Sequence, residues 1–314
     1  MSSQSREELD EGGTPSPIRD DVTFHRRGNK ALLVEGNLGN KITATPQIAF
    51  ASVEAGIAPT VTCRNNGKTV TDDGEQLSQP LIASFSAVRR PVQHLDSPVG
   101  VRLNAVTSGD AKYAVWSESQ LESQVLLCVA QEQAVVGYVA QFALFTWETP
   151  WGNIEHFPDI FVELRNGYRV IIDVRPESLW DEVFLTKAWM TARWATTEGI
   201  GYAIAGAIPT AQAALRRLAH GYKYAAGEIA EAAELIYQQR HTQPQAFVAT
   251  LARDCDLAPS VALAAVLQLV ARGLVDVDVW TRYDETTEVH FRGDTQDTFQ
   301  HLPLVWANDL VMER

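Results

Sequence analysis

The sequence is poor in cysteine and has no long hydrophobic run. Its three cysteines, Cys63, Cys128 and Cys255, are far apart, form no CxxC pair and are odd in number. This usage argues against a disulfide framework or a zinc site and is typical of a reducing compartment. No apolar run approaches the roughly 20 residues of a membrane-spanning helix, and the N-terminal MSSQSREELDEGG lacks the apolar core of a signal peptide. We therefore expect a cytoplasmic protein that makes no membrane contact.

Positive charge is also scarce. The chain has 26 Lys and Arg against 39 Asp and Glu, a formal net charge of −13, which argues against a protein that coats nucleic acid non-specifically. Acidic residues gather toward both ends of the chain, whereas the span 165–223 is rich in Lys and Arg, so a local basic face is compatible with the overall charge. Of the 314 residues, 46% are hydrophobic, enough for two domains of ordinary size and a tail.

The segment 156–177, HFPDIFVELRNGYRVIIDVRPE, carries the most informative pattern. Two β-rich runs, 157–164 and 168–174, flank Asn166-Gly167, a dipeptide that strongly favours a two-residue turn. The pattern predicts an antiparallel β-hairpin.

Two carboxylates mark the open end of this hairpin. Asp159 and Asp173 lie at nearly equal distances from the turn, so their side chains should be neighbours. Strand alternation places Asp173 and Arg175 on the same face. A carboxylate at the end of a buried strand is costly unless it has a partner or a metal. The alternative is a structural hairpin with a surface ion pair.

An amphipathic helix is predicted upstream, starting near Ser117 or Ser119. Glu122 falls in its first turn, beside the apolar stripe, and has two interpretations. Ser119-Gln120-Leu121-Glu122 fits a capping box, in which Glu122 only satisfies the helix start. Alternatively, Glu122 is a third acid of the same site.

The order of these motifs resembles that of the TnsA-like endonuclease subunits of heteromeric transposases, members of the PD-(D/E)xK restriction-endonuclease-like superfamily. The matching segments are SESQLES, VVGYVAQF, HFPDIFVE and VIIDVRPE, and the similarity covers roughly Val88 to Arg292. The resemblance implies an α/β fold: a restriction-endonuclease-like mixed sheet flanked by helices, a C-terminal winged-helix domain and, here, a β-rich N-terminal extension.

The resemblance also implies a metal site. Glu122, Asp159 and Asp173, with the Val174 carbonyl, would hold Mg²⁺, or Mn²⁺ in its place, and Gln141 would support them. Arg175 stands where the family has lysine. Because arginine stays protonated, it can act only as a fixed cation. Either the metal alone activates water, or the chain does not cut DNA.

Basic residues on two further predicted helices are candidates for DNA contact, with solvated outer faces as the alternative. They are Lys187 and Arg193 on a helix over 180–197, and Arg216, Arg217 and Lys223 on a helix over 211–224.

Composition and periodicity suggest a domain order along the chain. We expect a disordered acidic tail (1–21), a β-rich segment (22–87) that includes QIAFASVEAG and a hairpin about Asn66-Gly67, the nuclease-like domain (88–224), a winged-helix-like domain (225–292) and a C-terminal tail (293–314). Helices are predicted over 229–239, 245–253 and 260–271. The third, VALAAVLQLVAR, has few polar residues, which favours protein docking over insertion into a DNA groove.

The expected function is a Mg²⁺-dependent DNA endonuclease subunit that cuts at transposon ends. Its partners would be the DNA itself, a DDE transposase subunit (TnsB-like) and an AAA+ ATPase regulator (TnsC-like). The alternative is a catalytically inactive nuclease-fold adaptor that binds DNA or docks proteins.

Overall fold

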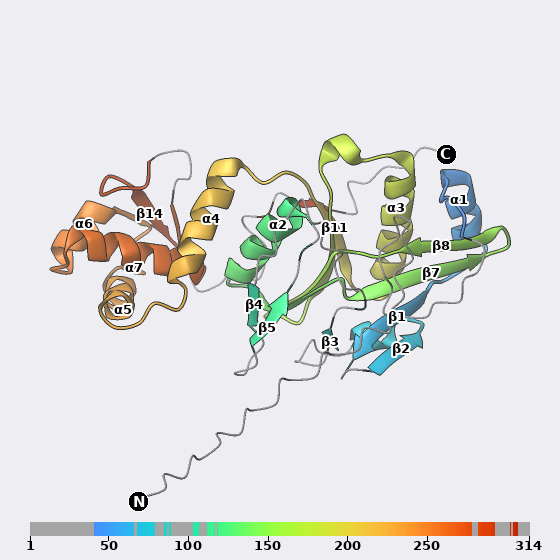
Figure 1. Ribbon diagram of the computed structural model, residues 1–314, viewed down its shortest axis with the longest axis horizontal. Coiled ribbons are helices and arrows are strands. Elements are labelled where there is room, and N and C mark those ends of the chain that lie inside the picture. The colour runs from blue at the N-terminus through green and yellow to red at the C-terminus, as the bar shows by residue number, and fades with distance from the viewer. Residues whose placement is uncertain are drawn as a thin grey trace, which may run out of the picture.

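The computed structural model describes residues 41–65, 68–78, 85–86, 88, 103–106, 112–115, 117, 119–277, 282–292, 302 and 304–306 (Figure 1). The expected acidic tail and the turn at residues 66–67 lie outside these ranges. The described part is a mixed α/β structure with several sheets.

A five-stranded sheet, the central sheet, has the order β15-β11-β10-β9-β6. β6, β9 and β10 form an antiparallel meander, α3 then crosses to β11, which is parallel to β10, and β15 pairs antiparallel with β11. The bounds are β6 (Val135–Ala140), β9 (Ile160–Leu164), β10 (Arg169–Val174), α3 (Glu182–Thr197), β11 (Gly201–Ala205) and β15 (Leu304–Trp306). The hairpin predicted about Asn166-Gly167 is confirmed as β9 and β10.

Helices cover both faces of this sheet, as Figure 1 shows around β11. α2 (Gln120–Gln131) packs on one face, where Ile172 and Ile160 join its apolar residues in one core. α3 packs on the other face, where Ile171 and Tyr202 join Ala188 in a second core. Successive residues of β10 therefore point to opposite helices, as the period of two in a strand requires.

A second sheet, with the order β2-β1-β7-β8, packs beside α3. β1 pairs antiparallel with both β2 and β7, and β3 also pairs with β1. The predicted hairpin of residues 60–63 and 68–71 is confirmed as β1 and β2, with Cys63 opposite Val70. The bounds are β1 (Thr60–Asn65), β2 (Lys68–Asp72), η1 (Glu75–Ser78), β3 (Phe85–Ser86), β7 (Ala143–Thr149) and β8 (Gly152–His156). A separate pair is formed by β4 (Leu103–Val106) and β5 (Lys112–Val115).

The segment QIAFASVEAG was expected to be a strand and is a helix, α1 (Pro46–Glu54). Thr45 caps it, accepting a hydrogen bond from the Ile48 amide at 3.5 Å, and Pro46 occupies the first turn, where its missing N–H costs nothing. A capped start therefore outweighs the weak β preference of the apolar residues.

The C-terminal unit, defined here as residues 225–292, follows α4 (Thr210–Tyr222). It contains α5 (Glu228–Arg240), α6 (Val248–Asp254), α7 (Pro259–Ala271) and a small sheet of β12 (Gln245–Phe247), β13 (Val275–Val277) and β14 (Glu288–Phe291). The helix expected from residue 245 begins three residues later, because Gln245–Phe247 pairs with β14 instead.

The chain then returns to the central sheet. β15 pairs with β11 after the C-terminal unit is complete, so part of the expected tail packs back onto the protein. Among the described residues, no single helix has the length and apolarity to cross a membrane. The pair α6 and α7 reaches those limits only jointly, with a bend of 113° between them.

Candidate functional site

Asp159 sits just before β9, where the central sheet meets the second sheet. Its Oδ2 accepts a hydrogen bond from the Val174 amide at 2.7 Å, and its Oδ1 accepts one from Gln141 Nε2 at 3.0 Å. The Gln141 amide also donates to the Asp159 carbonyl at 2.7 Å. Gln141 adopts a left-handed backbone, φ 52°, at the corner between β6 and β7. Both oxygens of the Asp159 carboxylate therefore have protein donors.

Asp173 lies near the end of β10 and is 1% exposed. Its Oδ2 accepts a short hydrogen bond from the Tyr202 hydroxyl and lies 3.0 Å from His156 Nε2. Tyr202 belongs to the core beneath α3, and His156 ends β8. Asp173 therefore points to the α3 face of the central sheet.

The proton positions around His156 follow from its other neighbour. Nδ1 lies 2.6 Å from Thr191 Oγ1, and Thr191 Oγ1 donates to the Lys187 carbonyl at 2.9 Å. When the threonine proton goes to that carbonyl, Nδ1 must be the donor to Thr191. The contact between Nε2 and Asp173 then needs a proton of its own, on the imidazole or on the carboxyl.

The environment of Tyr202 shifts its pKa strongly. Burial, followed by the negative charges of Asp173 and Asp159, raises the pKa of Tyr202 well above its usual value of 10. Tyr202 therefore stays a neutral donor to Asp173. The influence of both carboxylates on one phenol also agrees with the expectation that Asp159 and Asp173 are neighbours.

Glu122 lies in the first turn of α2 and is 7% exposed. Ser119 Oγ accepts a hydrogen bond from the Glu122 amide at 3.1 Å, and the same hydroxyl lies 3.4 Å from Glu122 Oε1. Ser119 therefore caps α2, which is the serine half of the predicted capping box, while the Glu122 carboxylate lies near the Ser119 hydroxyl. α2 covers the face of the central sheet opposite to the one that Asp173 faces.

These positions bear on whether the three acids fit a metal ion. Glu122 belongs to α2, which covers the face of the sheet opposite to the one that Asp173 faces, and both Asp159 and Asp173 accept hydrogen bonds from protein donors. Within the described ranges, no group of three or more His, Cys, Asp or Glu side chains is placed to hold a metal. Mg²⁺ needs several oxygen ligands converging at about 2.0–2.1 Å, and this donor set does not provide them. The reason is that α2 and α3 cover opposite faces of the central sheet, which the linear motif does not display.

Arg175 follows the predicted alternation and lies on the α3 side. Its Nε donates to the Leu179 carbonyl at 2.6 Å, its guanidinium lies 3.3 Å from Asp181 Oδ2, and its Cζ lies 4.7 Å from the centre of the Phe184 ring. Arginine at this position ties η2 (Glu177–Leu179) and the start of α3 to the end of β10. This is a structural use of the planar guanidinium that lysine could not reproduce.

The basic residues expected at DNA occupy different environments. Arg193 and Arg217 are exposed on α3 and α4. Lys187 is half-buried, and burial lowers its pKa. Only Arg193 and Arg217 of these have the accessibility that a phosphate contact needs.

The other two basic residues make contacts inside the protein. Arg216 is 4% exposed, with a terminal nitrogen 3.5 Å from Asp276 Oδ1. Lys223 donates to the Ala130 carbonyl at the end of α2, at 3.1 Å, and burial lowers its pKa. In these positions, neither side chain offers an open charge to a phosphate.

The sequence interpretation did not assign site roles to His156, Tyr202 or Thr191. A sequence signal existed for the first two residues. His156 stands directly before Phe157-Pro158-Asp159, and Tyr202 ends the segment Gly199-Ile200-Gly201-Tyr202. Thr191 had none, since its role depends on how α3 packs against β8.

Neither a scan against protein-family models nor a search of curated proteins finds a match to this chain. The similarity to TnsA-like subunits therefore depends on the motifs and their order.

Proposed function

We propose that this chain is a nuclease-fold subunit of a TnsA-like transposition system that docks partner proteins at transposon ends and does not cut DNA itself. The observation that supports this proposal is that, among the described residues, no group of three His, Cys, Asp or Glu side chains is placed to hold a metal. Asp173 instead faces α3, whereas Glu122 belongs to α2 on the other face of the central sheet.

The environment of Asp173 agrees with a structural role. A side chain that is 1% exposed, that accepts a hydrogen bond from Tyr202 and that contacts His156, contributes to the contact between β10, β11 and β8. Arg175 at the lysine position is tied to Leu179 and Asp181 in the same way.

The C-terminal unit supports docking of protein rather than insertion into DNA. Its order of three helices with a small sheet is that of a winged helix, in which α7 would be the recognition helix. The second half of α7 is buried, from Ala265 to Ala271, and packs with Ala219 of α4 in one core. That half of α7 has no free face for a DNA groove. The proposed partners are the TnsB-like transposase and the TnsC-like ATPase.

Metal binding tests the proposal more sharply than a cleavage assay, because cleavage in such systems would depend on partners. We expect calorimetric titration with Mn²⁺ to show no saturable site that requires Asp159 or Asp173. Asp181→Asn is the matched control, since Asp181 has 61% of its side chain exposed near the same sheet end. Stoichiometric Mn²⁺ binding that is lost in Asp173→Asn and retained in Asp181→Asn would overturn the proposal.

A second candidate, the Mg²⁺-dependent endonuclease, is favoured by one observation. Pro158-Asp159 directly precedes β9, and Asp173-Val174 closes the adjacent β10, with the Val174 amide 2.7 Å from Asp159 Oδ2. This is the arrangement of the PD-(D/E)xK motif along the chain. For cleavage, Asp173 would have to leave Tyr202 and His156, and Glu122 would have to leave its helix start. Cleavage of transposon-end DNA in the presence of both partners, abolished by Asp159→Ala in a protein of unchanged stability, would support this candidate.

A further inference from the structure

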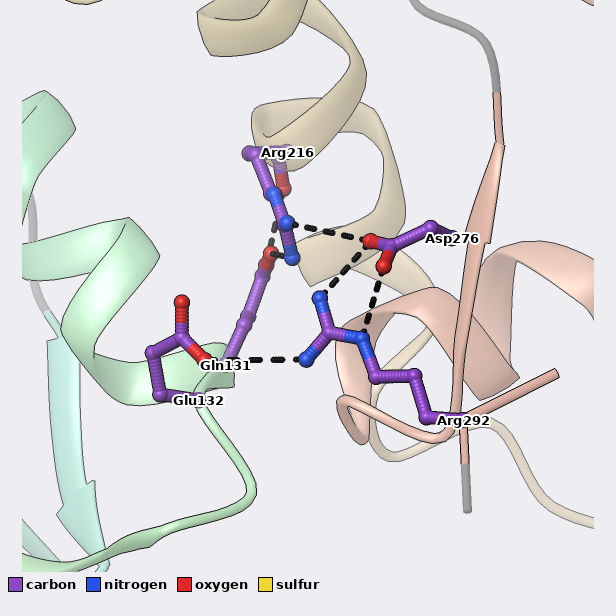
Figure 2. A network of polar contacts seen from close by, with 5 residues as sticks. All are labelled: Gln131, Glu132, Arg216, Asp276 and Arg292. Atoms are coloured by element: carbon purple, nitrogen blue, oxygen red, sulfur yellow. Dashed lines mark hydrogen bonds and ion pairs between the residues drawn. The ribbon is translucent and has the colours of Figure 1, made fainter. Parts of the chain in front are cut away.

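We infer that a buried, charge-balanced cluster locks the C-terminal unit onto the end of α2, so that this unit and the central sheet move as one rigid body. The cluster, called the latch here, consists of Gln131, Glu132, Arg216, Asp276 and Arg292 (Figure 2). This inference goes beyond the proposed function and does not depend on it.

The latch joins three parts of the chain. Gln131 and Glu132 come from the C-terminal end of α2, Arg216 comes from α4, and Asp276 and Arg292 come from the C-terminal unit, as Figure 2 shows. Residues far apart in sequence therefore meet at one point between the units.

Asp276 is the centre of the ionic contacts. Arg292 approaches it with two nitrogens, Nε at 2.8 Å from Oδ2 and a terminal nitrogen at 2.7 Å from Oδ1, while Arg216 lies 3.5 Å from Oδ1. The remaining terminal nitrogen of Arg292 lies 3.6 Å from Glu132 Oε2 across the boundary. Two cations thus face two anions.

Amide contacts complete the latch. Gln131 Nε2 donates to the Arg216 carbonyl at 3.0 Å, and the Arg216 guanidinium donates back to Gln131 Oε1 at 3.3 Å. Nearby, Lys223 donates to the Ala130 carbonyl at 3.1 Å. The end of α2 is therefore held by side chains of α4 and of the segment that enters the C-terminal unit.

Burial raises the free-energy cost of breaking these ion pairs. The side chains of Arg216, Arg292 and Glu132 are 5%, 4% and 2% exposed, and that of Asp276 is 26% exposed. Swinging the C-terminal unit away would separate Arg292 from Glu132 and Arg216 from Asp276, whereas an exposed ion pair would exchange its partner for water at little cost.

Gly273 provides independent support. A Cβ built on Gly273 would lie 2.3 Å from the Gln131 carbonyl oxygen and 3.1 Å from the Gln133 amide nitrogen. The turn after α7 therefore touches the backbone at the end of α2, and only glycine permits this approach. The two ends of the C-terminal unit also connect to the central sheet, through α4 and through β15.

A pair of glycine variants isolates the contact from backbone strain. Gly273 has φ 72°, and Gly199 has φ 69° with nothing within 4 Å of a built Cβ. Gly273→Ala and Gly199→Ala therefore introduce a similar left-handed alanine, but only Gly273→Ala pushes against α2. We expect native-state trypsin cleavage after Lys223 to accelerate by about a hundredfold in Gly273→Ala and by much less in Gly199→Ala.

Asp276→Asn tests the charges without changing side-chain shape. We expect the wild-type protein to unfold in a single transition, and Asp276→Asn to separate unfolding of the C-terminal unit from that of the central sheet. Two transitions in the wild-type protein would overturn the inference. Equal cleavage rates in Gly273→Ala and Gly199→Ala would also overturn it. So would a single, lowered unfolding transition in both Asp276→Asn and Gly273→Ala without faster cleavage after Lys223.

Discussion

The two polar clusters of this protein hold their carboxylates with different kinds of side chain. In the central sheet, Asp173 is held by the Tyr202 hydroxyl and by His156. In the latch, Asp276 and Glu132 are held by the guanidinium groups of Arg216 and Arg292. The first cluster fastens strands of adjoining sheets, and the second fastens separate units of the chain.

This difference in partners indicates which cluster relies more on interactions between full charges. A tyrosine hydroxyl donates a hydrogen bond to a carboxylate without adding a charge, so one of the two partners of Asp173 is neutral. The latch consists of full charges, of which Arg216, Arg292 and Glu132 are almost completely buried and Asp276 is 26% exposed, so removal of a carboxylate leaves a buried guanidinium with fewer partners. Substitutions in the latch should therefore have the larger effects.

Asp276→Ala should have the largest effect on stability. It leaves Arg216 and Arg292 facing each other without their shared carboxylate, and we expect the free energy of unfolding to fall by about 3–5 kcal/mol. Urea denaturation measures this change. Glu234→Ala is the control, because Glu234 pairs with Arg272 at 3.8 Å on the surface, and its loss should stay within about 0.5 kcal/mol.

Asp173→Ala should follow, with a loss of about 2–4 kcal/mol, because it leaves the buried Tyr202 hydroxyl and the buried His156 ring without their carboxylate partner. Thermal unfolding gives the measurement. This variant also separates the two candidate functions. An acid kept for metal binding would leave the melting temperature unchanged or raised when removed, and that result would contradict the structural role.

Tyr202→Phe should cost about 1.5–3 kcal/mol near neutral pH, since it removes one hydrogen bond to a charged group. The raised pKa of Tyr202 also gives its contribution a pH dependence. The neutral phenol is favoured in the folded state, so this contribution is complete below pH 10 and is lost as the pH rises above 10.

Denaturation at pH 8 and pH 11 checks the sign. The wild-type protein should lose more stability over this interval than Tyr202→Phe. An equal loss would mean that the phenol titrates alike in the folded and unfolded chains.

Ser119→Ala should have the smallest effect, about 1 kcal/mol, because it removes the cap of α2. Urea denaturation measures it, and Ser119→Asp, which keeps a capping oxygen, should restore most of the loss. A full loss in both variants would show that Ser119 acts through something other than the cap.

Much of the fold could be predicted from local patterns. The β9–β10 hairpin followed from Asn166-Gly167 and its flanking β-rich runs, and the start of α2 followed from Ser119 and the spacing of its apolar residues. The predictions were wrong where a short apolar segment is compatible with both a helix and a strand. The strand expected at QIAFASVEAG is the capped helix α1, and residues 245–247 pair with the edge of β14 that β13 does not occupy.

The candidate site was predicted less completely. The sequence placed Asp159 and Asp173 near one end of a hairpin and put Arg175 on the same face as Asp173, and the contacts of these residues agree. It could not show that Ile172 faces α2 while Asp173 faces α3, because that depends on which helix covers which face. The sequence also left Arg216 and Lys223 as candidates for DNA contact. In the structure α4 packs against both α2 and α7, and both side chains make contacts inside the protein.

By itself, the sequence determined the β9–β10 turn and the cap of α2, because these depend on neighbours within a few residues. Tertiary structure alone decided that α2, which carries Glu122, covers the face of the central sheet opposite to the one that Asp173 faces, and that Arg216 and Arg292 meet Asp276 and Glu132. The physical reason is that burial and charge pairing depend on segments that pack together from distant parts of the chain.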